Sequence, residues 1–283
     1  MENKRILLIG GTGYIGNSVL NHLLMVKSGV SCLIRNKSLH KIDGRDIKYF
    51  AGDLLDLDSV IEATVGMDIV INLASVVRTF KKNSYRENAI GLENLISAMR
   101  RNNVTRLIYF SSLNVNLKNK GYYASSKDEC ERIIKNSGIE YILIRPGYVY
   151  GIDKNNDFYR MSKMISLFRI APVIGDGNYK IQPVSKDDLA AITLNCVTAF
   201  QPGSIIEVAG SETVSINNVI SQIEGALGKK ALRMKIPLTL VKLMSRFVPF
   251  DVMGYNEDKI STEPYNFNYT SFNENLKKIV NIK

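Results

Sequence analysis

Short runs of apolar residues alternate with longer segments of helical period through the first half of the 283-residue chain. The apolar runs are continuous and rich in Val and Ile, which is typical of strands buried on both faces of a parallel sheet. Helices between consecutive strands indicate βαβ units. The pattern therefore predicts an α/β fold with a doubly wound parallel sheet. We expect its strands at residues 5–9, 30–34, 47–51, 69–73, 106–110 and 139–144, and its first helix at 14–27.

An amphipathic helix follows the fourth of these strands. Its apolar positions are spaced i, i+3, i+4 and i+7, so their side chains share one helix face. We interpret this face as part of the core and not as a cofactor-binding surface. The four residues are Leu92, Leu95, Ile96 and Met99.

The sequence becomes less regular after Gly151, where Gly and Pro residues interrupt shorter periodic segments. We predict a smaller region here, following a larger one that ends near residue 150. Within it, residues 239–250 are apolar and basic. This composition fits a helix at a membrane interface or a helix packed on the side that binds substrate. We favour the packed helix.

Lys and Arg outnumber Asp and Glu by 37 to 27, which gives a formal net charge of +10. Such a charge suits nucleic acid, anionic lipid or phosphorylated small molecules. The basic residues are spread along the chain, and no zinc-finger spacing, RNP-type aromatic motif or basic heptad region accompanies them. We therefore expect no nucleic-acid partner and interpret most of the charge as solvated surface.

The opening residues lack the features of a signal peptide, and no window approaches the about 18 apolar residues of a membrane span. Cys32, Cys130 and Cys196 are widely separated and show no C-x₂-C spacing. Neither a disulfide framework nor a zinc site is expected from such a set. We predict a cytoplasmic protein with reduced thiols, no transmembrane segment and no metal.

The first predicted strand leads directly into a glycine-rich turn, and a helical segment follows it. In a βαβ unit the first glycine permits a tight turn, the second lets the backbone approach a pyrophosphate, and the third lets helix and strand pack closely. The pyrophosphate then lies at the helix amino terminus, where unpaired N–H groups favour an anion. We predict a dinucleotide site of the Rossmann type at Gly10, Gly13 and Gly16.

The ends of the second and third strands face the adenosine half of such a dinucleotide. An acidic residue after the second strand would bind a ribose 2′-hydroxyl, whereas a cation accommodates a 2′-phosphate. This chain has Arg35 there and no acid, so we favour NADP(H) over NAD(H); stacking on adenine or exposure to solvent are the alternatives for Arg35. Asp53 follows the third strand and either contacts the adenine amino group or caps its own loop.

Tyr123 and Lys127 are four residues apart in a segment of helical period, so they share one helix face. A phenol, with a reference pKa of about 10, is a base at neutral pH only if a cation stabilises the phenolate. Lys127 supplies that cation and can bind the nicotinamide ribose; Tyr122 has Ser126 at the same offset. Ser112 ends the fifth strand, at the edge where parallel sheets bind ligands. We predict that Ser112, Tyr123 and Lys127 form an acid/base set for moving a hydride and a proton at one carbon.

These motifs occur in the order found in the extended and atypical short-chain dehydrogenases/reductases. More narrowly, the chain resembles the NAD-dependent epimerase/dehydratase group that acts on nucleotide sugars, over about residues 5–210. The resemblance implies an oxidoreductase or an isomerase of the epimerase type. The motifs are Gly10/Gly13/Gly16, Asp53-Leu54, Asn72-Leu73-Ala74-Ser75, Asn88 with Gly91, Ser111-Ser112, Tyr123-x-x-x-Lys127 and Arg145-Pro146-Gly147-Tyr148-Val149-Tyr150-Gly151.

The resemblance also implies individual roles. Ser112 and Tyr123 would do the chemistry with Lys127 in support, and Asn88 would bridge a helix and a strand. The pyrophosphate would contact Gly10, Thr12, Gly13, Tyr14, Ile15 and Gly16. Arg35, Asp53 and Leu54 would lie at the adenosine end, Leu73, Ala74 and Ser75 along the nicotinamide ribose, and Tyr123, Lys127, Pro146 and Val149 at the nicotinamide.

The same resemblance implies an NAD(P)-binding domain of residues 1–150, to which about residues 183–208 return. Residues 151–182 and 209–283 would form the small substrate-binding region. The helices around residues 88–100 and 127–136 would build a homodimer.

Departures from the family pattern narrow the activity. Ten residues separate Ser112 from Tyr123, where sugar-nucleotide epimerases have a longer loop. The fourth strand ends in Asn-Leu-Ala instead of His-Leu-Ala, a change we interpret as harmless. No basic residue for a substrate diphosphate is evident before the return segment, although Lys180 is near. Leu113 and Asn114 stand where dehydratases have an acid, so a 4,6-dehydratase is disfavoured.

We therefore predict an NADP(H)-dependent ketoreductase or epimerase whose substrate is a sugar nucleotide or a lipid-diphosphate-linked sugar. The alternative is a catalytically weak NADP(H)-binding accessory or redox-sensing module. The short loop before Tyr123 and the basic, apolar residues 235–250 suggest this second function. The sugar and the carbon attacked stay open.

Overall fold

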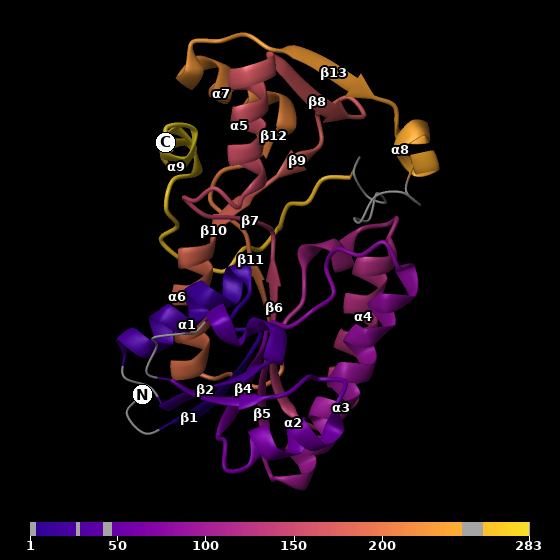
Figure 1. The fold of residues 1–283 in the computed structure, drawn as a ribbon, viewed down its shortest axis with the longest axis vertical. Helices are drawn as coiled ribbons and strands as arrows, with labels where there is room; N and C mark the ends of the chain where they lie inside the picture. The colour runs from indigo at the N-terminus through magenta and orange to yellow at the C-terminus, as the bar shows by residue number, and fades with distance from the viewer. Residues whose placement is uncertain (1–3, 27–28, 42–46, 245–256, 283) are drawn as a thin grey trace.

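The computed structural model describes residues 4–26, 29–41, 47–244 and 257–282. Its centre is a sheet of seven parallel strands in the order β11-β6-β5-β4-β1-β2-β3 (Figure 1). The strand order reverses between β1 and β4, which opens a crevice for ligands at the carboxyl ends of the strands. The strands are β1 (Arg5–Ile9), β2 (Gly29–Ile34), β3 (Lys48–Ala51), β4 (Ile69–Asn72), β5 (Arg106–Phe110), β6 (Glu140–Pro146) and β11 (Ser204–Val208).

Helices cover both faces of this sheet, because alternate residues of each strand are apolar on either side. Ile6 and Leu8 of β1 belong to one buried cluster, and Leu7 and Ile9 belong to the other. The helices α1 (Tyr14–Met25) and α6 (Lys186–Thr198) pack on the first face. The helices α2 (Leu57–Thr64), α3 (Glu87–Arg101) and α4 (Tyr122–Lys135) pack on the second. The predicted doubly wound fold is confirmed.

The six strands expected from the sequence are all present, each within two residues of its expected ends. The largest shift is in β6, which continues to Pro146 because Val208 of β11 pairs with it. The first helix ends at Met25, earlier than expected. The apolar stripe of α3 is buried in the core as predicted, at Leu92, Leu95, Ile96 and Met99.

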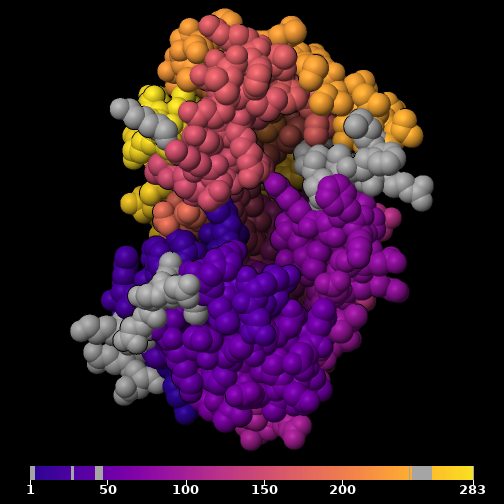
Figure 2. Space-filling model, viewed as in Figure 1, coloured from indigo at the N-terminus to yellow at the C-terminus, as the bar shows by residue number. Residues whose placement is uncertain are grey.

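The chain leaves the sheet after β6 and forms a second group of elements around a third apolar cluster, which includes Phe158, Val173, Ile220 and Leu276. Figure 1 shows this group beyond one end of the sheet, and Figure 2 shows a hollow between the two parts. Its elements are β7 (Tyr148–Tyr150), α5 (Asp157–Phe168), β8 (Ile170–Ile174), β9 (Lys180–Ile181), β10 (Pro183–Ser185), β12 (Val214–Ser215), α7 (Ile216–Leu227), β13 (Leu232–Ile236), α8 (Leu238–Met244) and α9 (Phe272–Val280). The division at residue 150, with its return segment, stays a prediction.

The basic, apolar segment predicted to be helical from residue 239 begins as α8, and residues 245–250 lie outside the described residues. Within the described part of the chain, no helix is both long and apolar enough to cross a membrane. The described residues also contain short 3₁₀ segments. The segment η1 (Asn36–Lys41) follows β2, η2 (Lys82–Arg86) precedes α3, and η3 (Leu113–Asn116) follows β5.

Candidate functional site

The glycine-rich turn between β1 and α1 is shaped by close backbone contacts. Gly10 has φ +87°, and a Cβ there would lie 2.7 Å from the Ala74 nitrogen. A Cβ on Gly16 would collide with the carbonyl oxygen of Gly10. Gly13 caps α1 without a side-chain hydrogen bond, and the first helical turn carries no acid. The turn thus presents backbone N–H groups to an anion and fits a pyrophosphate.

The segment after β4 lies directly against this turn. The Leu73 nitrogen donates to the Ile9 carbonyl oxygen (2.9 Å), and the Asn72 Oδ1 atom accepts from the Ala74 nitrogen (3.0 Å). Ser75 donates to Asn88 Oδ1 (3.3 Å). Leu73, Ala74 and Ser75 therefore lie at the edge of the crevice.

Asn88 of α3 forms hydrogen bonds to the segment after β4 and to α4. Its Oδ1 atom accepts from the Val76 nitrogen (2.7 Å), and its Nδ2 atom donates to Ser126 Oγ on α4 (3.0 Å). Ser126 in turn donates to the Tyr123 carbonyl oxygen (2.8 Å). The predicted role of Asn88 as a bridge is visible in these contacts.

Ser112 and Tyr123 lie side by side at the carboxyl end of β5. Ser112 caps η3, accepting from the Asn114 nitrogen (3.2 Å). Burial raises the pKa of Tyr123 to about 12, although a side-chain hydrogen bond with Ser112 lowers it. The neighbouring Tyr122 is exposed and stacks on Tyr85 of η2, with ring centroids 6.3 Å apart. Of the two tyrosines, only Tyr123 is bonded to the serine at the strand end.

Lys127 is almost fully buried beneath the same strand. Its Nζ atom donates to the Phe110 carbonyl oxygen (2.7 Å) and to the Tyr109 hydroxyl (3.1 Å), and it lies 4.6 Å from the centre of the Tyr109 ring. Burial lowers the pKa of Lys127 to about 8. An ammonium carries three protons, and two of them are donated to these oxygen atoms.

The expected electrostatic effect of Lys127 on the phenol stays a prediction, because Lys127 is not among the neighbours that shift the pKa of Tyr123 in this structure. Ser112, and not Lys127, is the neighbour that lowers the pKa of Tyr123. The physical reason is the orientation of the ammonium, which is directed to Phe110 and Tyr109. Burial therefore dominates, and the phenol is the protonated form over the neutral range.

The three residues predicted for the adenosine end lie apart from this set, beyond β2 and β3. Arg35 is exposed and forms no ion pair with another described residue. Asp53 accepts from the Leu55 nitrogen (3.0 Å). This contact fits the alternative in which Asp53 caps its own loop. Leu54 packs against Gly91, where a Cβ would come within 2.9 Å of the Leu54 Cβ atom.

Tyr14 links the glycine-rich turn to the chain after β7. Lys186 lies 4.7 Å from the centre of the Tyr14 ring and pairs with Asp153 (2.6 Å). A Cβ on Gly151 would meet the Tyr14 hydroxyl at 2.8 Å. Burial, and then Asp153, raise the pKa of Tyr14. Thr12 lies in the turn, and Ile15 follows Tyr14 in the first turn of α1.

Pro146 and Val149 lie on either side of the bend that leads out of the sheet. Pro146 pairs with Val208 of β11, and Val149 pairs with Val184 of β10. A Cβ on Gly147 between them would lie 3.4 Å from a Leu113 methyl group. This bend therefore lies beside η3, next to Ser112.

The short loop between Ser112 and Tyr123 is held by a distant residue. The Glu257 carboxylate accepts from the Lys118 nitrogen (2.8 Å), the Asn119 nitrogen (3.0 Å) and Asn119 Nδ2 (2.6 Å). The pKa of Glu257 would be raised by burial, but the bonds from Asn119 and Lys118 hold it below its ordinary value.

An ion pair between the buried Glu131 and the partly buried Arg145 lies next to the same region. Arg145 donates to both oxygens of the Glu131 carboxylate, at 2.9 and 2.7 Å, and Ser111 donates to one of them at 2.6 Å. Arg145 also contacts Glu207 (3.3 Å), which accepts from Ser261 (2.7 Å). Glu131 follows Lys127 by one helical turn, so this network fixes α4 against the end of the sheet.

Residues 10–199 match the family described as NAD(P)H-binding. The chain belongs to the NAD(P)H-binding family. It is therefore a member of a group of NAD(P)-dependent oxidoreductases and epimerases, and the resemblance to the extended short-chain dehydrogenases/reductases is confirmed.

Individual relatives are distant. The chain is 22% identical over 264 residues to the N-acetyl-alpha-D-glucosaminyl-diphospho-ditrans,octacis-undecaprenol 4-epimerase of Escherichia coli O157:H7, covering 84% of this chain and 77% of that protein. It is 22% identical over 261 residues to the photosystem II assembly factor Ycf39 of Cyanophora paradoxa, covering 89% and 77%. The UDP-glucose 4-epimerase of Thermus thermophilus, solved with NAD, superposes with a TM-score of 0.72 at 20% identity, over 98% of this chain and 97% of that one.

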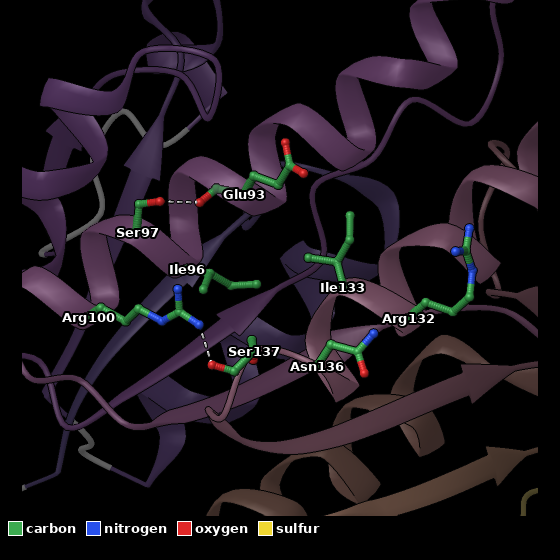
Figure 3. Close-up of a pocket in the computed structure, with 8 residues that line it drawn as sticks. All are labelled: Glu93, Ile96, Ser97, Arg100, Arg132, Ile133, Asn136 and Ser137. Atoms are coloured by element: carbon green, nitrogen blue, oxygen red, sulfur yellow. Dashed lines mark hydrogen bonds between the residues drawn. The ribbon is translucent and has the colours of Figure 1, made fainter.

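Within this NAD(P)H-binding fold, a hollow of about 360 Å³ lies between α3 and α4 (Figure 3). Ile96 and Ile133 line it, and Arg100 donates across it to the Ser137 carbonyl oxygen. None of the lining residues belongs to the glycine-rich turn or to the Ser112, Tyr123 and Lys127 set. The hollow lies on the surface where the sequence predicts a homodimer, which stays a prediction.

A second basic residue lies beside the predicted Lys180. Lys180 is exposed, and its backbone pairs with Lys259, whose nitrogen donates to the Lys180 carbonyl oxygen (2.8 Å). Lys259 lies 5.1 Å from the centre of the Tyr179 ring, and burial lowers its pKa to about 8. Sequence reasoning missed Lys259 because no motif surrounds it.

Proposed function

We propose that this protein is an NADP(H)-dependent epimerase or ketoreductase that acts on a diphosphate-linked sugar. The observation that supports it best is the hydrogen-bonded Ser112–Tyr123 pair at the carboxyl end of β5, with Lys127 buried beneath the same strand. The glycine-rich turn and the segment after β4 border the same crevice.

In this proposal Tyr123 gives a proton to, or takes one from, the oxygen on the reacting carbon. Ser112 holds that oxygen, and Lys127 donates its third proton to a ribose hydroxyl of the dinucleotide. The nicotinamide, when bound, supplies or takes up the hydride. A phenol that stays protonated at neutral pH suits the donation of a proton to a carbonyl oxygen during reduction.

The substrate class rests on similarity and charge. The undecaprenol-linked relative acts on a diphosphate-linked sugar according to its name. Lys180 of β9 and Lys259, in an isolated bridge beside β9, place two cations beyond the sheet, next to the Asp258 carboxylate that accepts from the Lys180 nitrogen. A diphosphate would find charge complementarity at the two ammonium groups.

The proposed activity is tested by incubating the purified chain with NADPH or NADP⁺ and a panel of UDP-sugars, dTDP-sugars and undecaprenyl-diphosphate sugars. Loss of NADPH absorbance reports reduction, and nuclear magnetic resonance of the sugar reports epimerisation. We expect conversion of at least one diphosphate-linked sugar. No conversion across the panel would contradict the proposal.

The preference for NADP(H) is tested at Arg35. We expect Arg35→Ala to weaken NADPH binding by about tenfold and to leave NADH binding nearly unchanged, because only NADPH carries a 2′-phosphate for the guanidinium. Fluorescence titration of both cofactors measures the two affinities. Lys37→Ala is the matched control, since Lys37 is exposed on the same turn. An equal loss of affinity for NADPH and NADH would show that Arg35 does not bind the 2′-phosphate.

The pH dependence of turnover is tested at Lys127. Its pKa of about 8 means that the ammonium loses its proton as the pH rises through 8, and with it the charge that binds the ribose. We therefore expect kcat to fall above about pH 8. Lys127→Arg should turn over more slowly but show no fall in this range, because a guanidinium stays protonated. A fall that is unchanged in Lys127→Arg would assign it to another group.

A non-catalytic accessory module is the second candidate, and the similarity to an assembly factor favours it. In that case NADPH would bind without turnover across the sugar panel, and a pull-down would recover a stoichiometric large partner. Conversion of any sugar by the wild type, abolished in Tyr123→Phe, would exclude this candidate.

A further inference from the structure

The two-stranded parallel sheet of β8 and β13 has one covered face and one uncovered face. Ala171 and Val173 of β8 are buried against α5 and α7, and their register partners on β13 are Arg233 and Lys235. Arg233 donates to Ser221 of α7 (2.7 Å), which confirms that this face is the helix side. The opposite face carries only apolar residues, namely Ile170, Pro172, Ile174, Leu232, Met234 and Ile236.

This outer face is open to solvent at its edge strand. The side chains of Leu232 and Met234 are 72% and 49% exposed. The helix α8 follows β13 directly and exposes Leu240 and Leu243, which are 45% and 76% exposed and three residues apart on one side of the helix. Several large apolar side chains in neighbouring elements are unusual on a protein surface without a partner. We call the outer face of β8 and β13 together with these two leucines the apolar face.

Most of the charge beside the apolar face is positive, although the exposed Asp176 lies two residues beyond the end of β8. Residues 229–244 contain five Lys or Arg residues and no Asp or Glu. The Lys230 side chain is 93% exposed, and its distance to the buried Glu224 is 3.9 Å. Lys235 and Arg169 are exposed and form no ion pair with any residue that the structure describes. Arg169 ends α5 beside Leu232, whose nitrogen donates to its carbonyl oxygen.

We propose that the apolar face with Lys230, Lys235 and Arg169 docks this protein onto an anionic lipid bilayer. The leucines and Met234 would enter the boundary between headgroups and acyl chains, and the cations would remain at the level of lipid phosphates. Lys235 leaves β13 on the side opposite Met234 and would lie above the inserted side chains. A second copy of the chain fits this surface less well. A two-fold interface would bring the Lys230 and Arg169 cations of two copies close together, whereas a bilayer with anionic headgroups neutralises them. This surface is independent of the reaction proposed above.

The test is sedimentation of the full chain with vesicles of phosphatidylcholine, alone or mixed with equal parts of phosphatidylglycerol, at low salt. We expect binding to the mixed vesicles and little binding to phosphatidylcholine alone. The double variants Leu232→Ser/Met234→Ser and Lys230→Gln/Lys235→Gln should each lower the partition coefficient by about tenfold. Unchanged circular dichroism shows that the variants are folded.

Two matched controls use the other part of the molecule. Met25→Ser/Val65→Ser removes apolar side chains that are 77% and 60% exposed, and Lys41→Gln/Arg101→Gln removes two exposed cations. Both should bind vesicles as the wild type does. The proposal is overturned if the wild type does not bind the mixed vesicles, or if the controls lose as much binding as the test variants. It is also overturned if Leu232→Ser/Met234→Ser converts a wild-type dimer to a monomer in analytical ultracentrifugation while vesicle binding persists.

Discussion

Replacing Tyr123 with Phe is expected to lower kcat by about 10²–10⁴-fold, the usual contribution of a positioned acid or base. The substitution removes one oxygen atom from a ring beside Ser112 and leaves the glycine-rich turn untouched. Affinity for NADPH should therefore stay within about twofold. The measurement is turnover of whichever diphosphate-linked sugar the panel identifies, together with fluorescence titration of the cofactor.

Tyr122→Phe is the control for this experiment. Tyr122 is the preceding residue and has the same side chain, but it is 57% exposed and stacks on Tyr85. Its turnover should match the wild type. Full activity of Tyr123→Phe, or an equal loss in both variants, would remove Tyr123 from the mechanism.

Glu131→Gln is expected to lower the free energy of unfolding by about 3 kcal/mol, because it leaves the partly buried Arg145 guanidinium without its main countercharge. This loss of stability should lie at the lower end of the range expected when one partner of a buried ion pair is removed, since Glu207 remains 3.3 Å from Arg145. Urea denaturation monitored by circular dichroism measures it. Glu140→Gln is the control, because its pair with Arg106 is about half exposed and should contribute less than about 1 kcal/mol.

The contribution of Glu131 also depends on pH. Burial would raise its pKa, but hydrogen bonds from Arg145 and Ser111 outweigh that effect and lower it. A carboxyl whose pKa is lower in the folded state stabilises the fold above its unfolded pKa and loses this contribution as the pH falls through the folded one. The difference between wild type and Glu131→Gln should therefore be present at about pH 7 and shrink below about pH 4. A constant difference across this range would contradict the assignment.

The sheet could be predicted because strands buried on both faces leave a strong record in the sequence. In β1, Ile6 and Leu8 pack on one layer of helices while Leu7 packs on the other, so no polar residue interrupts the run. The strands beyond residue 147 have two to five residues, and in β8 buried and partly exposed positions alternate. Such short segments do not stand out from loops.

The site was predictable where it depends on local spacing. Tyr123 and Lys127 share a face because they are one helical turn apart, and Ser112 lies nearby because it ends a parallel strand. The direction of the Lys127 ammonium was not predictable. It depends on Tyr109, whose hydroxyl reaches Lys127 only because that strand position faces α4. The contact of Glu257 with residues 118 and 119 was equally unpredictable, since no motif near Glu257 indicates which distant residues it binds.

The bonds from Glu257 have a consequence for the order in which the protein can assemble. They join positions 138 and 139 residues apart, and Ser261 with Glu207 spans another 54. Contacts of such high sequence separation form late, because the intervening chain must first be ordered. On a ribosome, the glycine-rich turn would emerge and fold long before residue 257 is synthesised. The loop beside Ser112 would gain its contacts with Glu257 only after that residue has been synthesised, so it would be ordered later than the glycine-rich turn.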